Sequence, residues 1–140
     1  MDIYAVMTEI DVRLRTISGL RVAEFGHARS IQPPAAVQYP PERINFDGTY
    51  GRGSDEYEDH IVVVLVGSAN ARSALKAVAP YLAGSGAKSI KAKLDYSNAA
   101  PYTSCSDLTV QWAELDASAR IAGGDYLAAL FHCKITGAGA

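Results

Sequence analysis

The residues with the clearest potential for chemistry lie in one segment, FDGTYGRGSDEYEDH, residues 46–60. Its carboxylates and its histidine are ligand types for Mg²⁺, Mn²⁺ and Zn²⁺, so a site built around Asp47, Glu58 and His60 is one hypothesis. Side chains alternate along a strand, however, which would place Glu58 and His60 on the face opposite Asp59. The segment also lacks the spacing of a calcium loop. We therefore favour a solvated acidic loop over a metal site.

A second segment, GSGAKS at residues 84–89, resembles the end of a phosphate-binding loop. Such a loop needs glycine, lysine and Ser or Thr in direct succession, after a strand and at the start of a long helix. Here Ala87 separates Gly86 from Lys88, and the preceding residues predict a helix. We interpret the segment as the glycine end of one helix, followed by Ser89 as the cap of the next.

Nucleophilic catalysis is not indicated either. Ser73 and Lys76 have S-x-x-K spacing, but the partner motifs and larger scaffold of serine acyltransferases are missing. The histidines are widely separated, and none belongs to a recognisable triad. Arg52 could reach a phosphate, but the neighbouring carboxylates would repel it, which favours a flexible tip with an arginine that contacts a partner. We therefore expect neither an enzyme nor a cofactor.

The composition is that of one soluble globular domain over residues 1–140. The apolar content of 49%, the charged content of 20% and the net charge of −2 argue against both a disordered chain and a basic nucleic-acid binder. The longest apolar run, 61–66, is too short to cross a bilayer, and the first residues do not form a signal peptide. Cys105 and Cys133 lack the spacing of a zinc pair, which favours reduced thiols in a cytosolic protein.

The elements that position these residues follow from apolar periodicity. Apolar residues at three- and four-residue steps predict an amphipathic helix over residues 3–17, with Asp2 as its cap. A short strand is predicted at residues 20–25. Four prolines within residues 33–41 argue against a central strand there, so PPAAVQYPP should be extended and lie at a sheet edge.

The remaining elements complete an α+β fold. Residues 57–66 predict a strand at the centre of the sheet, and helices are predicted over 70–84 and in SIKAKLDY. Two closing strands at 108–113 and 127–135 should be joined through a turn at residues 116–118. The predicted fold class is α+β, a mixed or antiparallel sheet with two to three helices packed on it and a long extended loop over residues 46–59.

Three segments occur in a distinctive order: YPPERINFDGTYGRGSDEYEDHIVVVLVG, LAGSGAKSIKAKLD and IAGGDYLAALFHCKITG. A proline-led P..I.FD.TYGRG.D segment precedes an apolar strand that ends in glycine, and GSGA.S.KA.L and G.DYLAA.F...I.G.G segments follow. This order resembles the tail terminator proteins of long-tailed bacteriophages, particularly those of actinobacterial hosts. The resemblance covers about two thirds of the chain, from Tyr39 to the C-terminus.

The resemblance implies a small, non-enzymatic α+β subunit of a phage virion. Such subunits form a ring, typically a hexamer, at the head-proximal end of the tail tube, where the ring ends tube polymerisation and provides the surface on which the head docks. The implied partners are further copies of the chain, the major tail tube protein and the head-tail connector or stopper protein. Genome DNA would pass through the lumen without specific binding, no membrane is involved, and the protein would be assembled into the virion tail or neck in the host cytoplasm.

Two sets of residues are predicted to act in such a ring. Sheet edges and glycine-jointed arms can serve neighbouring subunits, which leads us to expect that the loop over residues 46–59 orders on contact with a neighbour or the tail tube. The expected contact residues are Tyr39, Phe46, Asp47, Tyr50 and Arg52. Acidic groups around a lumen would repel DNA phosphates. The lumen-facing candidates are Asp55, Glu56, Glu58 and Asp59.

Two alternatives remain open from the sequence. The first is a head completion or stopper protein between the portal and the tail of the same virion. The second is a small metal-dependent enzyme or ligand-binding domain built around Asp47, Glu58 and His60.

Overall fold

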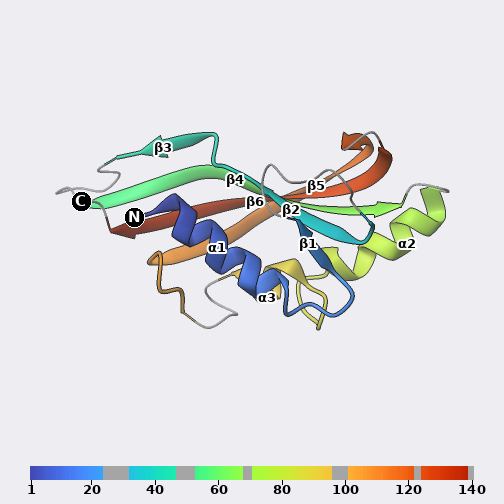
Figure 1. Cartoon of the computed structure of the whole chain (residues 1–140), viewed down its shortest axis with the longest axis horizontal. Coiled ribbons are helices and arrows are strands. Elements are labelled where there is room, and N and C mark those ends of the chain that lie inside the picture. The colour runs from blue at the N-terminus through green and yellow to red at the C-terminus, as the bar shows by residue number, and fades with distance from the viewer. Residues whose placement is uncertain (24–31, 47–52, 68–70, 96–100, 122–123, 139–140) are drawn as a thin grey trace.

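The computed structural model describes residues 1–23, 32–46, 53–67, 71–95, 101–121 and 124–138, with the backbone alone given for residues 71, 117–121 and 124–126. The described helices are α1 (Ile3–Leu14), α2 (Ala71–Leu82) and α3 (Ile90–Leu94). The described strands are β1 (Arg21–Ala23), β2 (Ala35–Tyr39), β3 (Arg43–Asn45), β4 (Ser54–Gly67), β5 (Asp107–Ile121) and β6 (Gly124–Ala138). The predicted α+β fold class is therefore confirmed (Figure 1).

The described strands form one mixed sheet in the order β1-β2-β4-β6-β5, and β3 pairs with β4 beside this path. β1 runs parallel to β2, whereas β2, β3 and β6 each pair antiparallel with β4. β4 is thus the central strand, as its apolar run predicted. The long antiparallel pairs of β6 with β4 and β5 form most of the sheet.

α1 forms where the apolar periodicity predicted a helix. Asp2 caps it, because its carboxylate accepts hydrogen bonds from the backbone N–H groups of Tyr4 (2.9 Å) and Ala5 (3.4 Å). The buried face consists of Val6, Ile10 and Leu14 at four-residue steps. The helix ends at Leu14, one turn earlier than predicted, and the chain then turns toward β1.

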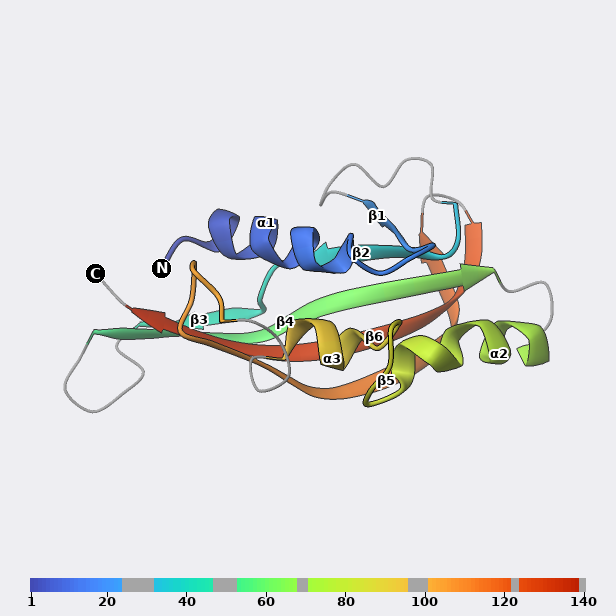
Figure 2. The same cartoon turned by 90° about the horizontal axis from the view of Figure 1, so that it is seen from below.

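The helices contribute to a single core on one face of the sheet, which we call the inner face. This core joins residues of α1, α2 and α3 to inward side chains of β4 and β6, including Val62, Val64, Ala129, Phe131 and Ile135. Figure 2 shows α2 and α3 lying along the sheet, with α1 beside β2. Ser89 caps α3 by accepting a hydrogen bond from the N–H of Ala92 (3.1 Å), which confirms the predicted cap.

The opposite face of the sheet, which we call the outer face, carries the alternate side chains of β4 and β6. A smaller apolar cluster of Val63, Leu65 and Ala128, flanked by Ile61 and Leu130, occupies this face. Farther along β6, the same face carries His132 and Lys134, since residues two apart in a strand share a face.

Three expectations about the strands are wrong. β2 is an interior strand between β1 and β4, because the prolines lie immediately outside its five paired residues and leave its backbone donors intact. Residues 116–118 do not form the predicted turn, because β5 continues to Ile121. The predicted loop over residues 46–59 is also too long, since β4 begins at Ser54. No helix in the described ranges is long and apolar enough to cross a membrane.

Candidate assembly surface

Two of the predicted contact residues, Tyr39 and Phe46, lie within the described residues. Tyr39 ends β2 and is partly exposed, and Phe46, directly after β3, has 76% of its surface exposed. The other predicted contacts, Asp47, Tyr50 and Arg52, lie outside the described residues. Among the described residues of the segment that carries the resemblance, Phe46 is the most exposed large apolar side chain, ahead of Tyr39 and Ile44.

The predicted acidic group is divided between the two faces of β4. Asp55 is buried, and its charge raises the pKa of the inward-facing Tyr57, although burial of that phenol is the larger cause. On the outer face, Glu56 pairs with Lys134 (3.4 Å). Glu58 accepts hydrogen bonds from Arg43 (2.9 and 2.5 Å) and from Asn45 (2.7 Å). The hydrogen bond to Arg43 is the main reason why the pKa of Glu58 is lowered.

A β-bulge in β4 overturns the expected alternation of side chains. Asp59 has a φ of +57°, and the register with β6 shifts between Tyr57 and His60, so that one extra residue is inserted. As a result, Tyr57 and His60 both belong to the inner face, while Glu58 and Asp59 line the same outer pocket. The prediction that Glu58 shares a face with His60 is wrong. Glu58 and Asp59 lie on the face opposite His60, so these three side chains do not converge on one point.

His132 lies on the outer face of β6, between the bulged strands β4 and β5. Its Nδ1 contacts the carboxylate of Asp59, and its Nε2 lies 2.9 Å from Oε1 of Glu114. A second bulge, between Val110 and Trp112 in β5, places the indole of Trp112 on the imidazole, with ring centres 3.6 Å apart and planes 6° from parallel. The imidazole is thus bonded at both nitrogens and stacked on an indole ring.

The charge of His132 follows from these contacts. Burial alone would lower its pKa, but the hydrogen bonds and charges of Asp59 and Glu114 outweigh burial and raise the pKa above its ordinary value. A positively charged imidazole stacked on an indole is favourable. His132, Asp59 and Glu114 therefore join β6, β4 and β5 through charge-assisted bonds. Sequence reasoning missed this cluster, although the alternation of Leu130, His132 and Lys134 already placed the histidine on the outer face.

His60 lies in a separate, buried network on the inner face. Its Nε2 is 2.8 Å from Oε1 of Gln38, and the Gln38 amide nitrogen donates to the Met7 carbonyl (2.8 Å) and the Asp11 carboxylate (2.6 Å). Burial lowers the pKa of His60 to about 4. His60 is therefore neutral near pH 7 and serves to attach α1 to β2 and β4.

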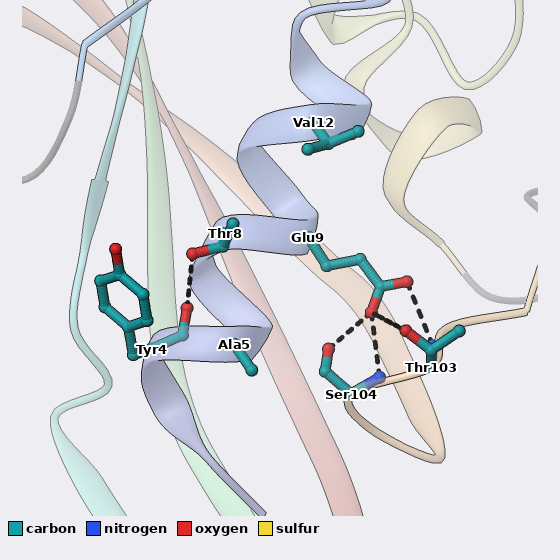
Figure 3. Close-up of a pocket in the computed structure, with 7 residues that line it drawn as sticks. All are labelled: Tyr4, Ala5, Thr8, Glu9, Val12, Thr103 and Ser104. Atoms are coloured by element: carbon teal, nitrogen blue, oxygen red, sulfur yellow. Dashed lines mark hydrogen bonds between the residues drawn. The ribbon is translucent and has the colours of Figure 1, made fainter.

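A shallow groove follows the exposed side of α1 (Figure 3). Tyr4, Thr8 and Val12 line the helix side, and Thr103 and Ser104 line the other. Glu9 closes the groove, because its carboxylate accepts hydrogen bonds from the backbone N–H groups and hydroxyls of both Thr103 and Ser104. Burial would raise the pKa of Glu9, but these bonds lower it. Glu9 fixes the connection before β5 to α1.

Within the described ranges, no group of three or more His, Cys, Asp or Glu side chains is arranged to hold a metal ion. No known protein family matches the chain, and no curated protein matches it either.

Proposed function

We propose that this chain is a structural virion protein that forms a ring at the head-proximal end of a phage tail tube. In this role it ends tube polymerisation and provides the docking surface for the head. The sequence resemblance to tail terminators suggests the role. One structural observation supports it best: the segment that carries the resemblance exposes Phe46 directly after β3, a strand that an ion pair from Arg43 to Glu58 joins to β4.

An exposed aromatic side chain on a well-ordered support is typical of an interface contact. β3 is fixed to β4 by three paired residues and by the bonds from Arg43 and Asn45 to Glu58. Phe46 follows this short strand directly and does not belong to either apolar cluster of the described core. Binding to a neighbouring subunit or to the tail tube would remove this side chain from water.

The proposed lumen role of the acidic residues remains a prediction. Glu56, Glu58 and Asp59 each pair with a cation of the same chain, which reduces the repulsion they can exert on DNA phosphates. Asp55 is buried on the other face and contributes little at the surface. If these residues line a lumen, the surface they present is close to neutral and does not strongly repel DNA.

The function is tested with purified protein and purified tail tubes by electron microscopy. We expect rings on one end of the tubes, and we expect Phe46→Ser to reduce their occupancy by about tenfold. Val12→Ser, which removes a comparably exposed apolar side chain from α1, is the matched control and should have little effect.

A genetic experiment separates the terminator from the stopper. Loss of a terminator should leave tails of uncontrolled length, whereas loss of a stopper should leave normal tails and heads that leak DNA. Normal tails together with intact heads would refute both virion roles. A rise in melting temperature with saturating divalent metal would instead favour the metal-dependent alternative.

A further inference from the structure

The charges of the chain are separated along the sequence. Residues 71–94 contain five cations and no carboxylate, although the whole chain has 15 carboxylates and 13 cations. The remaining residues therefore carry a clear excess of negative charge. Arg72 and Lys76 on α2 are exposed, and Lys91 on α3 is paired with Asp95 (2.8 Å).

Part of this charge is also separated in space, because Arg72 and Lys76 lie on α2 whereas Lys91 and Lys93 lie on α3. α2 lies at one end of the long axis of the molecule, and β3 and the start of β4 lie at the other end (Figures 1 and 2). Around the β3 end, carboxylates outnumber cations even when His132 is counted as charged. Among the described residues there, the carboxylates are Asp2, Glu42, Asp55, Glu56, Glu58 and Asp59, and the cations are the amino group of Met1, Arg43, Lys134 and His132. Because Glu56, Glu58 and Asp59 are paired and Asp55 is buried, the excess negative charge at the surface lies mainly on Asp2 and Glu42.

Each charged end also exposes apolar side chains. At the basic end, Leu75 stands between Arg72 and Lys76 and has 51% of its surface exposed. At the acidic end, Phe46 is 76% exposed and Ile44 is 37% exposed. Apolar groups surrounded by charged ones are the usual composition of a protein–protein contact.

We propose that the α2 end of one copy docks on the β3 end of a second copy. The basic end, defined by Arg72, Leu75 and Lys76, meets the acidic end, defined by Glu42, Ile44 and Phe46. The two patches differ, so the contact is heterologous, and repeating it generates a closed ring when the rotation closes. This inference rests on the proposed function and assigns the subunit contact of the ring.

A second copy fits the basic end better than nucleic acid does. The chain as a whole is negatively charged, which opposes binding to a phosphate backbone. Leu75, which lies between the two cations, would remain in water if the basic end bound a phosphate backbone. Contact with Phe46 and Ile44 of a second copy would instead bury it. Opposite charges at the two ends also favour head-to-tail approach over head-to-head approach.

Charge reversal at each end, alone and in mixture, tests the contact. The basic-end variant is Arg72→Glu/Lys76→Glu, and the acidic-end variant is Glu42→Lys, which leaves the Arg43–Glu58 pair that holds β3 intact. Self-association of the full chain is measured by sedimentation and native mass spectrometry, and ring formation is measured on tail-tube ends. Each variant alone should associate at least about tenfold more weakly at about 50 mM salt, and an equimolar mixture of the two should recover association.

The control variant Arg15→Glu/Lys93→Glu changes the net charge by the same amount as the basic-end variant but near the middle of the molecule, and it should associate like the wild type. Circular dichroism and thermal melting check that each variant is folded, and Arg72→Gln/Lys76→Gln should give an intermediate loss of association.

Unchanged association of the basic-end variant, or a mixture that does not recover association, overturns the proposal while the ring function stands. The proposal is also overturned if the basic-end variant binds a short DNA duplex more weakly than the wild type does but self-associates as strongly. A wild-type chain that forms no ring even on tail tubes refutes the proposed function itself.

Discussion

His60→Gln isolates the acid sensitivity of the buried network under α1. The native His60 side chain is fully buried, and its Nδ1 has no hydrogen-bond partner within the part of the chain that the structure describes. A second proton on His60 would therefore enter an unsolvated site, because Gln38 is its hydrogen-bond partner and the Asp11 carboxylate is bonded to the far side of Gln38. A glutamine amide can still donate to Oε1 of Gln38, but it does not titrate.

The sign and size of the effect follow from the shift in pKa. Burial lowers the pKa of folded His60 from 6.5 to about 4, so the unfolded chain takes up the proton first as the pH falls. The contribution of His60 to stability is complete above pH 6.5 and is lost as the pH falls toward 4. Each pKa unit corresponds to about 1.4 kcal/mol, and the wild type should therefore lose about 2 kcal/mol from this group between pH 7 and pH 5.

Urea unfolding followed by far-ultraviolet circular dichroism measures this loss. At one fixed protein concentration, the free energy of unfolding of His60→Gln should fall by about 2 kcal/mol less than that of the wild type between about pH 7 and pH 5. The other titrating groups are shared by both proteins and cancel in the comparison. An equal fall in both proteins would refute the assignment of the acid sensitivity to His60.

Three further outcomes are expected. His132→Gln should lower the free energy of unfolding most below about pH 6.5, because only the charged imidazole of the wild type pairs with Asp59 and Glu114. The difference between the two proteins should shrink as the pH rises through the pKa of His132 in the folded protein, which is raised above its ordinary value. A difference that does not change with pH would contradict this. Burial raises the pKa of Cys105 to about 11 and that of Cys133 to about 12, so a thiol reagent near pH 8 should label the denatured chain much faster than the native protein. Gly86→Ala should cost about 1–2 kcal/mol, because Gly86 has a φ of +110°, whereas Gly84→Ala should be nearly neutral in the same thermal melts.

Local sequence signals predicted the elements that depend on near neighbours. The stripe of Val6, Ile10 and Leu14 predicted α1, Asp2 and Ser89 were recognised as caps, and the apolar run before Gly67 predicted the central strand. In each case the signal lies within a few residues of the structure it specifies. These elements give the fold class but do not determine which outward side chains meet.

The parts that were missed depend on pairing between distant segments. The prolines around β2 argued for an edge, yet they lie outside its paired residues. Asp59 and His132 are 73 positions apart, and they meet only because a bulge with positive φ turns Asp59 onto the outer face. A bulge leaves a weak sequence signal when no glycine marks it, and strand alternation before and after it then leads to the wrong face.

The ion pairs on the outer face help to choose between the two roles predicted for the acidic residues. Repulsion of DNA works best with carboxylates that have no nearby cation, because each paired cation cancels most of the field at a distance. A contact surface has the opposite requirement, since a carboxylate that already has its partner costs less to remove from water than a free one. Glu58, bonded to Arg43 and Asn45, and Asp59, bonded to His132, meet the second requirement and not the first. The pairing therefore favours a contact with a neighbouring copy over a place in the lumen, and it directs the first charge-reversal experiments to the β3 end.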